Sequence, residues 1–290
     1  MAQAESRVAV VTGASSGIGK ATAKALAAQG WHVIAHGRDP ARSAAAEAEI
    51  KAAAAPGARV DTVRGDLSLL SDAARMADEI AALTDRVDAL LNNAGGVRDK
   101  MIITPEGNEA TFAGNHLGHF LLTTRLLPQL RKAAASAAPG AVRIVNVSSR
   151  GHMMCPGIDW DDLQQTRDWV SVNAYGLVKL CNILFTRELA KRLGGDGIVA
   201  HAMHPGVVAS NFGMDGTPEM REHMAKTATI SPEEGADTLI WLATAEEPGA
   251  ANGLYYHNRE AIDPAPAALD DAAAARLWQE SEALVAKAGF

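Results

Sequence analysis

The chain has 290 residues, of which 48% are hydrophobic and 21% are charged, a balance typical of a globular protein with a sizeable core. Its formal net charge of −7 argues against a general nucleic-acid-binding surface, and no apolar run reaches the ~20 residues of a membrane-spanning helix. The first residues lack a signal-peptide apolar region, and the two cysteines, Cys155 and Cys181, have no CxxC spacing, so we expect a reduced, cytoplasmic protein with no membrane partner.

Short runs of β-branched residues alternate along the chain with helical patterns. The runs predict seven strands, over 8–12, 32–36, 59–64, 88–92, 143–147, 198–204 and 253–256. Helices are predicted between them, for example over 18–29, 40–54 and 69–83. Because the strands are almost continuously apolar, helices should cover both faces of a parallel sheet. The sequence therefore predicts an α/β fold, a Rossmann-type doubly wound sheet of about seven strands in a single domain over 1–290.

Two long segments interrupt this alternation within the expected core, 7–256. Residues 150–172 and 207–230 are interpreted as substrate-side insertions, since long irregular segments in compact domains are usually functional. Soft or aromatic side chains that could cover an apolar substrate occur in the second segment, at Phe212, Met214, Met220 and Met224. An amphipathic pattern predicts a C-terminal helix over about 270–288.

The first predicted strand passes into a helix through the sequence TGASSGIG, residues 12–19. Gly13 allows a tight turn, Gly17 allows the backbone to approach a phosphate, and Gly19 allows the helix to pack on the strand. Free N–H groups and the positive end of the helix dipole would then bind a pyrophosphate. The turn predicts a dinucleotide site.

The spacing of these glycines is GxxxGxG, at which point the sequence resembles the short-chain dehydrogenase/reductase family. Further motifs follow in the family's order, namely LNNAG (91–95), GNHLGHFLLT (114–123), RIVNVSS (143–149), AYGLVK (174–179) and HPGVVAS (204–210). Together they extend over about 7–256. Among subgroups, the sequence is similar to the retinol-dehydrogenase-like and oxidoreductase branch.

Tyr175 and Lys179 are four residues apart on one predicted helix, so their side chains share a face. A nearby ammonium favours a phenolate and should move the pKa of the tyrosine from about 10 toward neutrality. The resemblance implies that Tyr175 exchanges a proton with the substrate oxygen and that Lys179 also holds the nicotinamide ribose.

The resemblance implies two further catalytic residues. Ser149 would hydrogen-bond the substrate carbonyl, where negative charge develops during hydride attack. Ser148 is the alternative, because adjacent side chains in a strand point to opposite faces and only one can serve. Asn115 would support a water linked to Lys179.

The cofactor could be NADP or NAD. Asp39 lies 20 residues after Gly19, where an acid would bind the ribose 2′-hydroxyl of NAD. Arg38 occupies the place of the arginine in NADP-preferring relatives, and a guanidinium pairs well with a 2′-phosphate, to which Lys20 could add charge. We favour NADP. The resemblance places the cofactor against Gly13, Ser15, Ser16, Gly17, Ile18, Gly19, Arg38, Asp66, Leu67, Asn93, Ala94, Gly95, Tyr175, Lys179, Pro205, Gly206 and Val208.

The sequence thus predicts an NADP(H)-dependent oxidoreductase that interconverts a carbonyl and an alcohol on an apolar small molecule. An NAD-dependent alcohol dehydrogenase, a nucleotide-sugar epimerase or dehydratase, and an NADP-sensing protein without turnover are the alternatives. His116 and His119 have a spacing that can bind metal, but no further ligand is near them in the sequence and no metal is expected. The family resemblance implies a homodimer or homotetramer.

Overall fold

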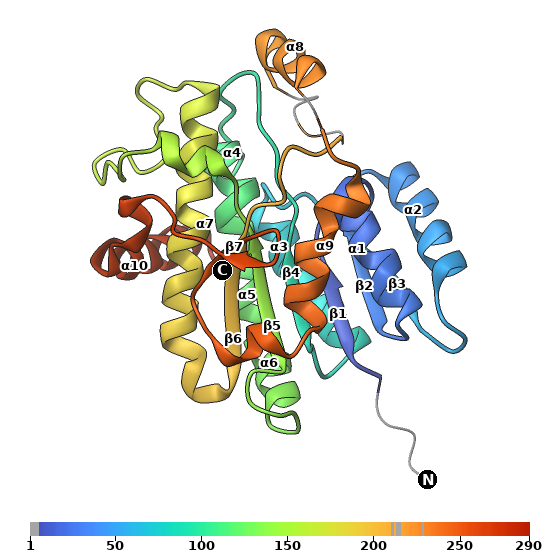
Figure 1. Ribbon diagram of the computed structural model, residues 1–290. Coiled ribbons are helices and arrows are strands. Elements are labelled where there is room, and N and C mark those ends of the chain that lie inside the picture. Colours follow the sequence, from blue (N-terminus) through green and yellow to red (C-terminus); the bar gives the residue numbers. More distant parts are fainter. Residues whose placement is uncertain (1–5, 210–211, 213–215, 228) are drawn as a thin grey trace.

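The computed structural model describes residues 6–209, 212, 216–227 and 229–290 (Figure 1). Its strands form one sheet in the order β3-β2-β1-β4-β5-β6-β7-β8. Neighbouring strands are parallel throughout, except for the antiparallel pair β7–β8. The strands are β1 (Val8–Val11), β2 (His32–Gly37), β3 (Val60–Arg64), β4 (Ala89–Asn92), β5 (Val142–Val147), β6 (Ile198–Met203), β7 (Tyr255–His257) and β8 (Glu260–Ala261).

Helices cover both faces of the sheet (Figure 1), which confirms the predicted α/β, Rossmann-type fold. They are α1 (Gly17–Ala28), α2 (Pro40–Ala53), α3 (Leu70–Leu83), α4 (Ala110–Phe112), α5 (Gly118–Arg125), α6 (Leu127–Ala134), α7 (Ser171–Leu193), α8 (Pro218–Lys226), α9 (Pro232–Thr244) and α10 (Asp271–Lys287). Among the described helices, none is both long and apolar enough to span a bilayer.

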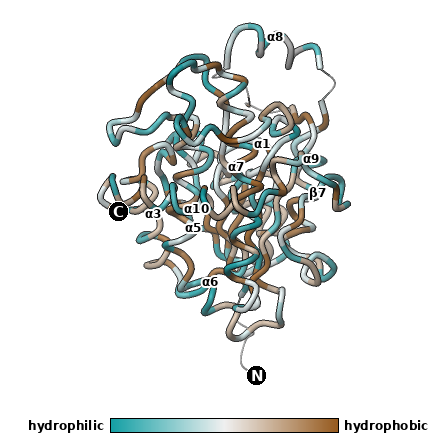
Figure 2. The backbone as a smooth tube through the Cα atoms, turned by 90° about the vertical axis from the view of Figure 1, so that its left-hand side faces the viewer, coloured by the Kyte–Doolittle hydropathy of each residue, from teal (hydrophilic) through white to brown (hydrophobic). Residues whose placement is uncertain are grey.

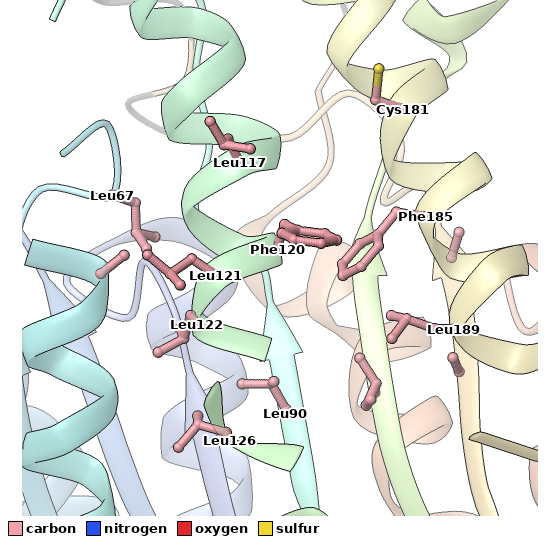
Figure 3. Packing of buried hydrophobic residues seen from close by; sticks show 14 of the residues in the cluster. Leu67, Leu90, Leu117, Phe120, Leu121, Leu122, Leu126, Cys181, Phe185 and Leu189 are labelled. Carbon is pink, nitrogen blue, oxygen red and sulfur yellow. The ribbon is translucent and has the colours of Figure 1, made fainter. Parts of the chain in front are cut away.

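Alternate residues of the buried strands belong to two different cores. In β1, Ala9 and Val11 pack with α1, α2 and α9, whereas Val8 and Val10 pack with α3, α5, α7 and α10. Hydrophobic segments accordingly gather in the middle of the fold (Figure 2). In the second core, Phe120 of α5 and Phe185 of α7 meet with ring centres 5.5 Å apart (Figure 3). Trp278 of α10 packs on both, so the C-terminal helix closes this core.

The strand β8 was not predicted, because two residues carry no readable pattern. It follows a tight turn in which Asn258 and Arg259 have φ values of 49° and 61°. Left-handed pairs of this kind join the strands of two-residue hairpins. The predicted strand 253–256 begins later than expected, at Tyr255, since Gly253 has a φ of 75°.

The two irregular segments acquire short helices of their own. Residues 150–154 form a 3₁₀ helix and α8 lies within 207–230, standing beyond the carboxyl ends of the strands (Figure 1). Val208 and Ile230 form a parallel β-bridge, with Ala209 N–H donating to Ile230 O at 2.9 Å and Ile230 N–H donating to Val207 O at 2.9 Å. The chain therefore leaves the body of the fold and returns to it at one point.

Candidate active site

A cavity of about 450 Å³ opens at the carboxyl ends of the strands. It lies where the sheet order reverses, since β1 pairs with β2 on one side and with β4 on the other, and ligands of doubly wound folds bind at this point. All predicted site residues except Ser15 line it: Gly13, Ser16, Gly17, Ile18, Gly19, Arg38, Asp66, Leu67, Asn93, Ala94, Gly95, Asn115, Ser149, Tyr175, Lys179, Pro205, Gly206 and Val208. Ser15 instead lies beside Gly37 of β2.

The glycine turn has the conformation and closeness that only glycine permits. Gly13 and Gly17 have φ values of 70° and 53°, in the left-handed region. A Cβ atom on Gly19 would lie 2.3 Å from the backbone oxygen of Gly13. The helix α1 begins directly after Ser16, whose side chain makes no capping hydrogen bond, and its first turn carries no acidic residue within 17–20. The backbone N–H groups of this first turn, at the positive end of the helix dipole, therefore fit a pyrophosphate.

Thr12 fastens the glycine turn to the loop that follows β4. Its Oγ1 accepts hydrogen bonds from the backbone N–H groups of Asn93 and Ala94, each at 2.9 Å. The side-chain amide of Asn93 donates in return to Thr12 O at 2.8 Å. Sequence reasoning overlooked Thr12, although its position at the end of a buried strand was a usable signal.

The far end of the cavity is basic. Arg38 and Arg42 line it, together with Asp66, whose carboxylate lies 3.6 Å from the Arg38 guanidinium. Arg42 was not predicted. Lys20 is engaged elsewhere, since its ammonium donates to Glu49 at 2.8 Å.

Asp39 is not among the lining residues. Its carboxylate accepts the backbone N–H of Arg42 at 2.8 Å and so caps the first turn of α2. This hydrogen bond holds the pKa of Asp39 below its usual value. The acid is therefore committed to a helix cap, a role that short polar residues commonly fill.

Tyr175 and Lys179 lie together on α7 at the other end of the cavity. The Lys179 Nζ is 5.4 Å from the centre of the Tyr175 ring and donates to Val147 O at 3.2 Å. Burial raises the pKa of Tyr175 to about 12, although its hydrogen bond with Ser149 lowers it. The expected shift of this pKa toward neutrality was therefore wrong for the protein alone, because desolvation outweighs the hydrogen bond with Ser149. Burial also lowers the pKa of Lys179, to about 8.

The two candidate serines differ in their partners. The Ser148 hydroxyl donates to the backbone oxygen of Lys179 at 2.7 Å and is buried. The Ser149 hydroxyl accepts from Gly151 N–H at 3.1 Å and is hydrogen-bonded to Tyr175. Although both residues line the cavity, Ser149 is the one beside the tyrosine.

Asn115 lies in a π-helical turn, Ala113–Leu117, between α4 and α5. Its side chain accepts from Gly96 N–H at 3.1 Å and donates to Gly96 O at 3.0 Å. A Cβ atom on Gly95 would lie 2.5 Å from Asn115 Oδ1 and 3.2 Å from Lys179 Nζ, so these three residues adjoin. Single π turns inside helices are frequent at functional sites.

Apolar residues border the end of the cavity at which Tyr175 lies. The Phe212 ring lies 5.3 Å from that of Tyr175, and Val207 lines the cavity. Met214 lies outside the described residues, as do the side chains of Met220 and Met224. Met153 and Met154, which follow Ser149 closely, are about half exposed.

Comparison with known proteins identifies the family of the chain. The family model of short chain dehydrogenases matches residues 7–221. Human retinol dehydrogenase 13 is 38% identical over 287 residues, which cover 96% of this chain and 84% of that protein. This chain is a short-chain dehydrogenase. It belongs to the retinol-dehydrogenase-like branch of that family of oxidoreductases, which act on small molecules with a nicotinamide cofactor.

Two solved structures of similar fold extend the comparison. The crystal structure of an uncharacterised protein from Mycobacterium paratuberculosis has a TM-score of 0.75 at 32% identity and covers 97% of this short-chain dehydrogenase and 93% of its own chain. The Pseudomonas aeruginosa RhlG/NADP active-site complex has a TM-score of 0.68 at 27% identity, with coverage of 86% and 93%.

The histidine pair of this short-chain dehydrogenase has two separate sets of partners. His116 Nε2 lies 2.9 Å from Ser281 Oγ of α10, whereas His119 faces Thr12 and Asn115. Within the described part of the chain, no three His, Cys, Asp or Glu residues are placed to hold a metal ion. Cys155 and Cys181 are buried free thiols.

Proposed function

We propose that this protein is an NADP(H)-dependent oxidoreductase that interconverts a carbonyl and an alcohol on an apolar small molecule. The observation that carries the proposal is the two-ended cavity. Tyr175, Ser149 and Lys179 line one end, and Arg38 and Arg42 line the other. The glycine turn and the N-terminal turn of α1 lie between these ends and suit the pyrophosphate of a dinucleotide.

NADPH, when bound, supplies the hydride that reaches the carbonyl carbon. Tyr175 then donates its hydroxyl proton to the substrate oxygen, which balances the charge of the new alkoxide. With a pKa near 12 the tyrosine is protonated at neutral pH, the state that reduction requires. The Ser149 hydroxyl donates a hydrogen bond to the same oxygen. The Lys179 ammonium stabilises the phenolate that remains.

The interactions of the charged residues at the basic end favour NADP over NAD. Asp39, the residue that would bind a ribose 2′-hydroxyl, already caps α2. Two guanidiniums, of Arg38 and Arg42, line the cavity and would pair with a 2′-phosphate. The apolar substrate is supported by Phe212 beside Tyr175 and by Val207.

A titration of the purified protein with NADPH and NADH tests the proposal without a substrate. We expect NADPH to bind at least about tenfold more tightly, a difference of about 1.4 kcal/mol, and the preference to be lost in Arg38→Ala. Preference for NADH would favour the NAD-dependent alcohol dehydrogenase. Binding of neither dinucleotide would contradict the oxidoreductase proposal.

Turnover is tested with an apolar aldehyde such as decanal. Tyr175→Phe removes the transferable proton and keeps the ring, so we expect turnover to be abolished while NADPH still binds. Wild-type protein that binds NADPH but turns over no carbonyl or alcohol across an apolar panel would favour the NADP-sensing alternative.

A further inference from the structure

His119, the second residue of α5, is a buried polar residue that the proposed mechanism does not use. Its side chain is 2% exposed. Its Nδ1 lies 3.2 Å from the backbone oxygen of Asn115, and its Nε2 lies 2.9 Å from Thr12 Oγ1. The imidazole thus bridges the π turn that carries Asn115 and the end of β1.

The partners fix which ring nitrogen carries the proton. A carbonyl oxygen only accepts, so Nδ1 must be the N–H and Nε2 must carry the lone pair. The Thr12 hydroxyl therefore donates to His119 Nε2, while its oxygen accepts the N–H groups of Asn93 and Ala94. Burial lowers the pKa of His119 to about 3, which keeps the ring neutral at physiological pH.

The resulting chain of hydrogen bonds joins two walls of the site, the loop at 93–95 and the π turn that carries Asn115. Each group in it donates to the next, from the loop toward Asn115. It begins at the amides of Asn93 and Ala94, both of which line the cavity. It passes through Thr12 and His119 and ends at the carbonyl of Asn115. The side chain of Asn115 in turn holds Gly96. A neutral histidine can accept at one end and donate at the other, as this path requires.

We propose that His119 is a positioning residue, which sets the distance between the dinucleotide-contacting loop at 93–95 and the Asn115–Lys179 wall. The inference rests on the proposed function. Without His119 the carbonyl of Asn115 loses a buried donor, and the Thr12 hydroxyl turns to its other acceptor, Leu91 O, at 3.2 Å. The hydrogen bonds between the Asn115 side chain and Gly96 would then remain as a link between the two walls.

His116 provides a matched control in the π turn that runs directly into α5. It is three residues away, 1% exposed, and its pKa is also lowered to about 3 by burial. Its ring contacts Phe112 and Phe185, and its Nε2 faces Ser281 of α10. Replacing His116 thus removes an equally buried imidazole without touching the chain from Asn93 to Asn115.

The experiment compares His119→Leu with His116→Leu in NADPH binding and in the reduction of decanal. We expect both variants to lose thermal stability, but only His119→Leu to raise the Kd for NADPH and lower kcat, each by about tenfold, or about 1.4 kcal/mol. His119→Gln, whose amide offers an acceptor oxygen and a donor NH₂ group, should recover most of both. Equal functional effects of the two leucine variants, or a His119→Leu protein within twofold of wild type, would overturn the proposal.

A measurement on the wild-type protein keeps the proposal testable if a variant does not fold. In ¹⁵N NMR of the imidazoles, His119 should carry its proton on Nδ1 and should not titrate between pH 5 and 9. A proton on Nε2 would break the inferred path and overturn the proposal. Wild-type protein that binds neither dinucleotide overturns the proposed function instead, and this outcome is separate from the tautomer result.

Discussion

The Lys179 ammonium lies 5.4 Å from the centre of the Tyr175 ring, and burial works against the charge of both groups. It raises the pKa of the tyrosine to about 12 and lowers that of the lysine to about 8. Of the two, the lysine is therefore the first to lose its proton as the pH rises. A protonated Tyr175 hydroxyl therefore lies beside a positively charged Lys179 only below about pH 8.

This order of titration predicts the pH profile of carbonyl reduction. The kcat/KM, which reports on the free enzyme, should be level near pH 7 and fall above about pH 8, as Lys179 becomes neutral and ceases to stabilise the phenolate. Steady-state rates with NADPH and decanal from pH 6 to 10 measure it. A level profile across pH 7 to 10 would contradict the assignment.

Arg42 should contribute to the choice of cofactor. We expect Arg42→Ala to weaken NADPH binding by about tenfold, since hydrogen bonds to charged groups contribute about 1.5–3 kcal/mol, and to leave NADH binding within twofold. Lys20→Ala is the control, because Lys20 is paired with Glu49. Fluorescence titrations measure both. Equal losses for NADPH and NADH would mean that Arg42 does not bind the 2′-phosphate.

Replacing the two serines one at a time should have different effects, one on catalysis and the other on stability. Ser149→Ala removes a donor to the developing oxyanion and should lower kcat by about 10²–10³-fold. Ser148→Ala removes a buried hydrogen bond to the Lys179 carbonyl and should lower the free energy of unfolding by about 1 kcal/mol, with kcat little changed. Urea unfolding and steady-state kinetics distinguish them, and exchanged phenotypes would make Ser148 the catalytic serine.

Trp278 should be required for stability but not for chemistry. Its ring packs on Phe120 and Phe185 and lies 4.2 Å from the Arg192 guanidinium. We expect Trp278→Ala to lower the free energy of unfolding by about 3–5 kcal/mol, and Trp278→Phe to lower it less. The fraction that remains folded should keep its NADPH affinity. A weakened affinity in that fraction would show that α10 influences the cavity.

The sequence patterns that predicted the fold are those in which one physical requirement acts over many residues. Apolar strands such as Ile198–Met203 must be buried on both faces, and short apolar runs, most of them β-branched, therefore located seven of the eight described strands. The proposed catalytic positions followed from motifs whose order is specific to a family. The glycines were interpretable because the left-handed φ at Gly13 and Gly17 is a local requirement.

What sequence reasoning overlooked depends on contacts between distant segments. Thr12 matters because it meets Asn93, which is 81 positions away. Arg42 lines the cavity because it lies in the first turn of α2, which begins after the N-cap residue Asp39. The raised pKa of Tyr175 arises from desolvation by the surrounding fold, which no spacing of tyrosine and lysine reports. The π turn at Asn115 has no sequence signal that we used.

The β-bridge between Val208 and Ile230 has a consequence for how such enzymes diversify. The segment between the two bridge residues forms a loop whose ends are held together. Because the entropic cost of closing a loop rises only slowly with its length, the length and composition of this segment can change at little cost in folding free energy. Grafting the corresponding stretch from a relative onto this bridge should exchange the preferred alcohol while the dinucleotide site stays as it is. We therefore expect such a graft to change substrate preference without changing cofactor preference.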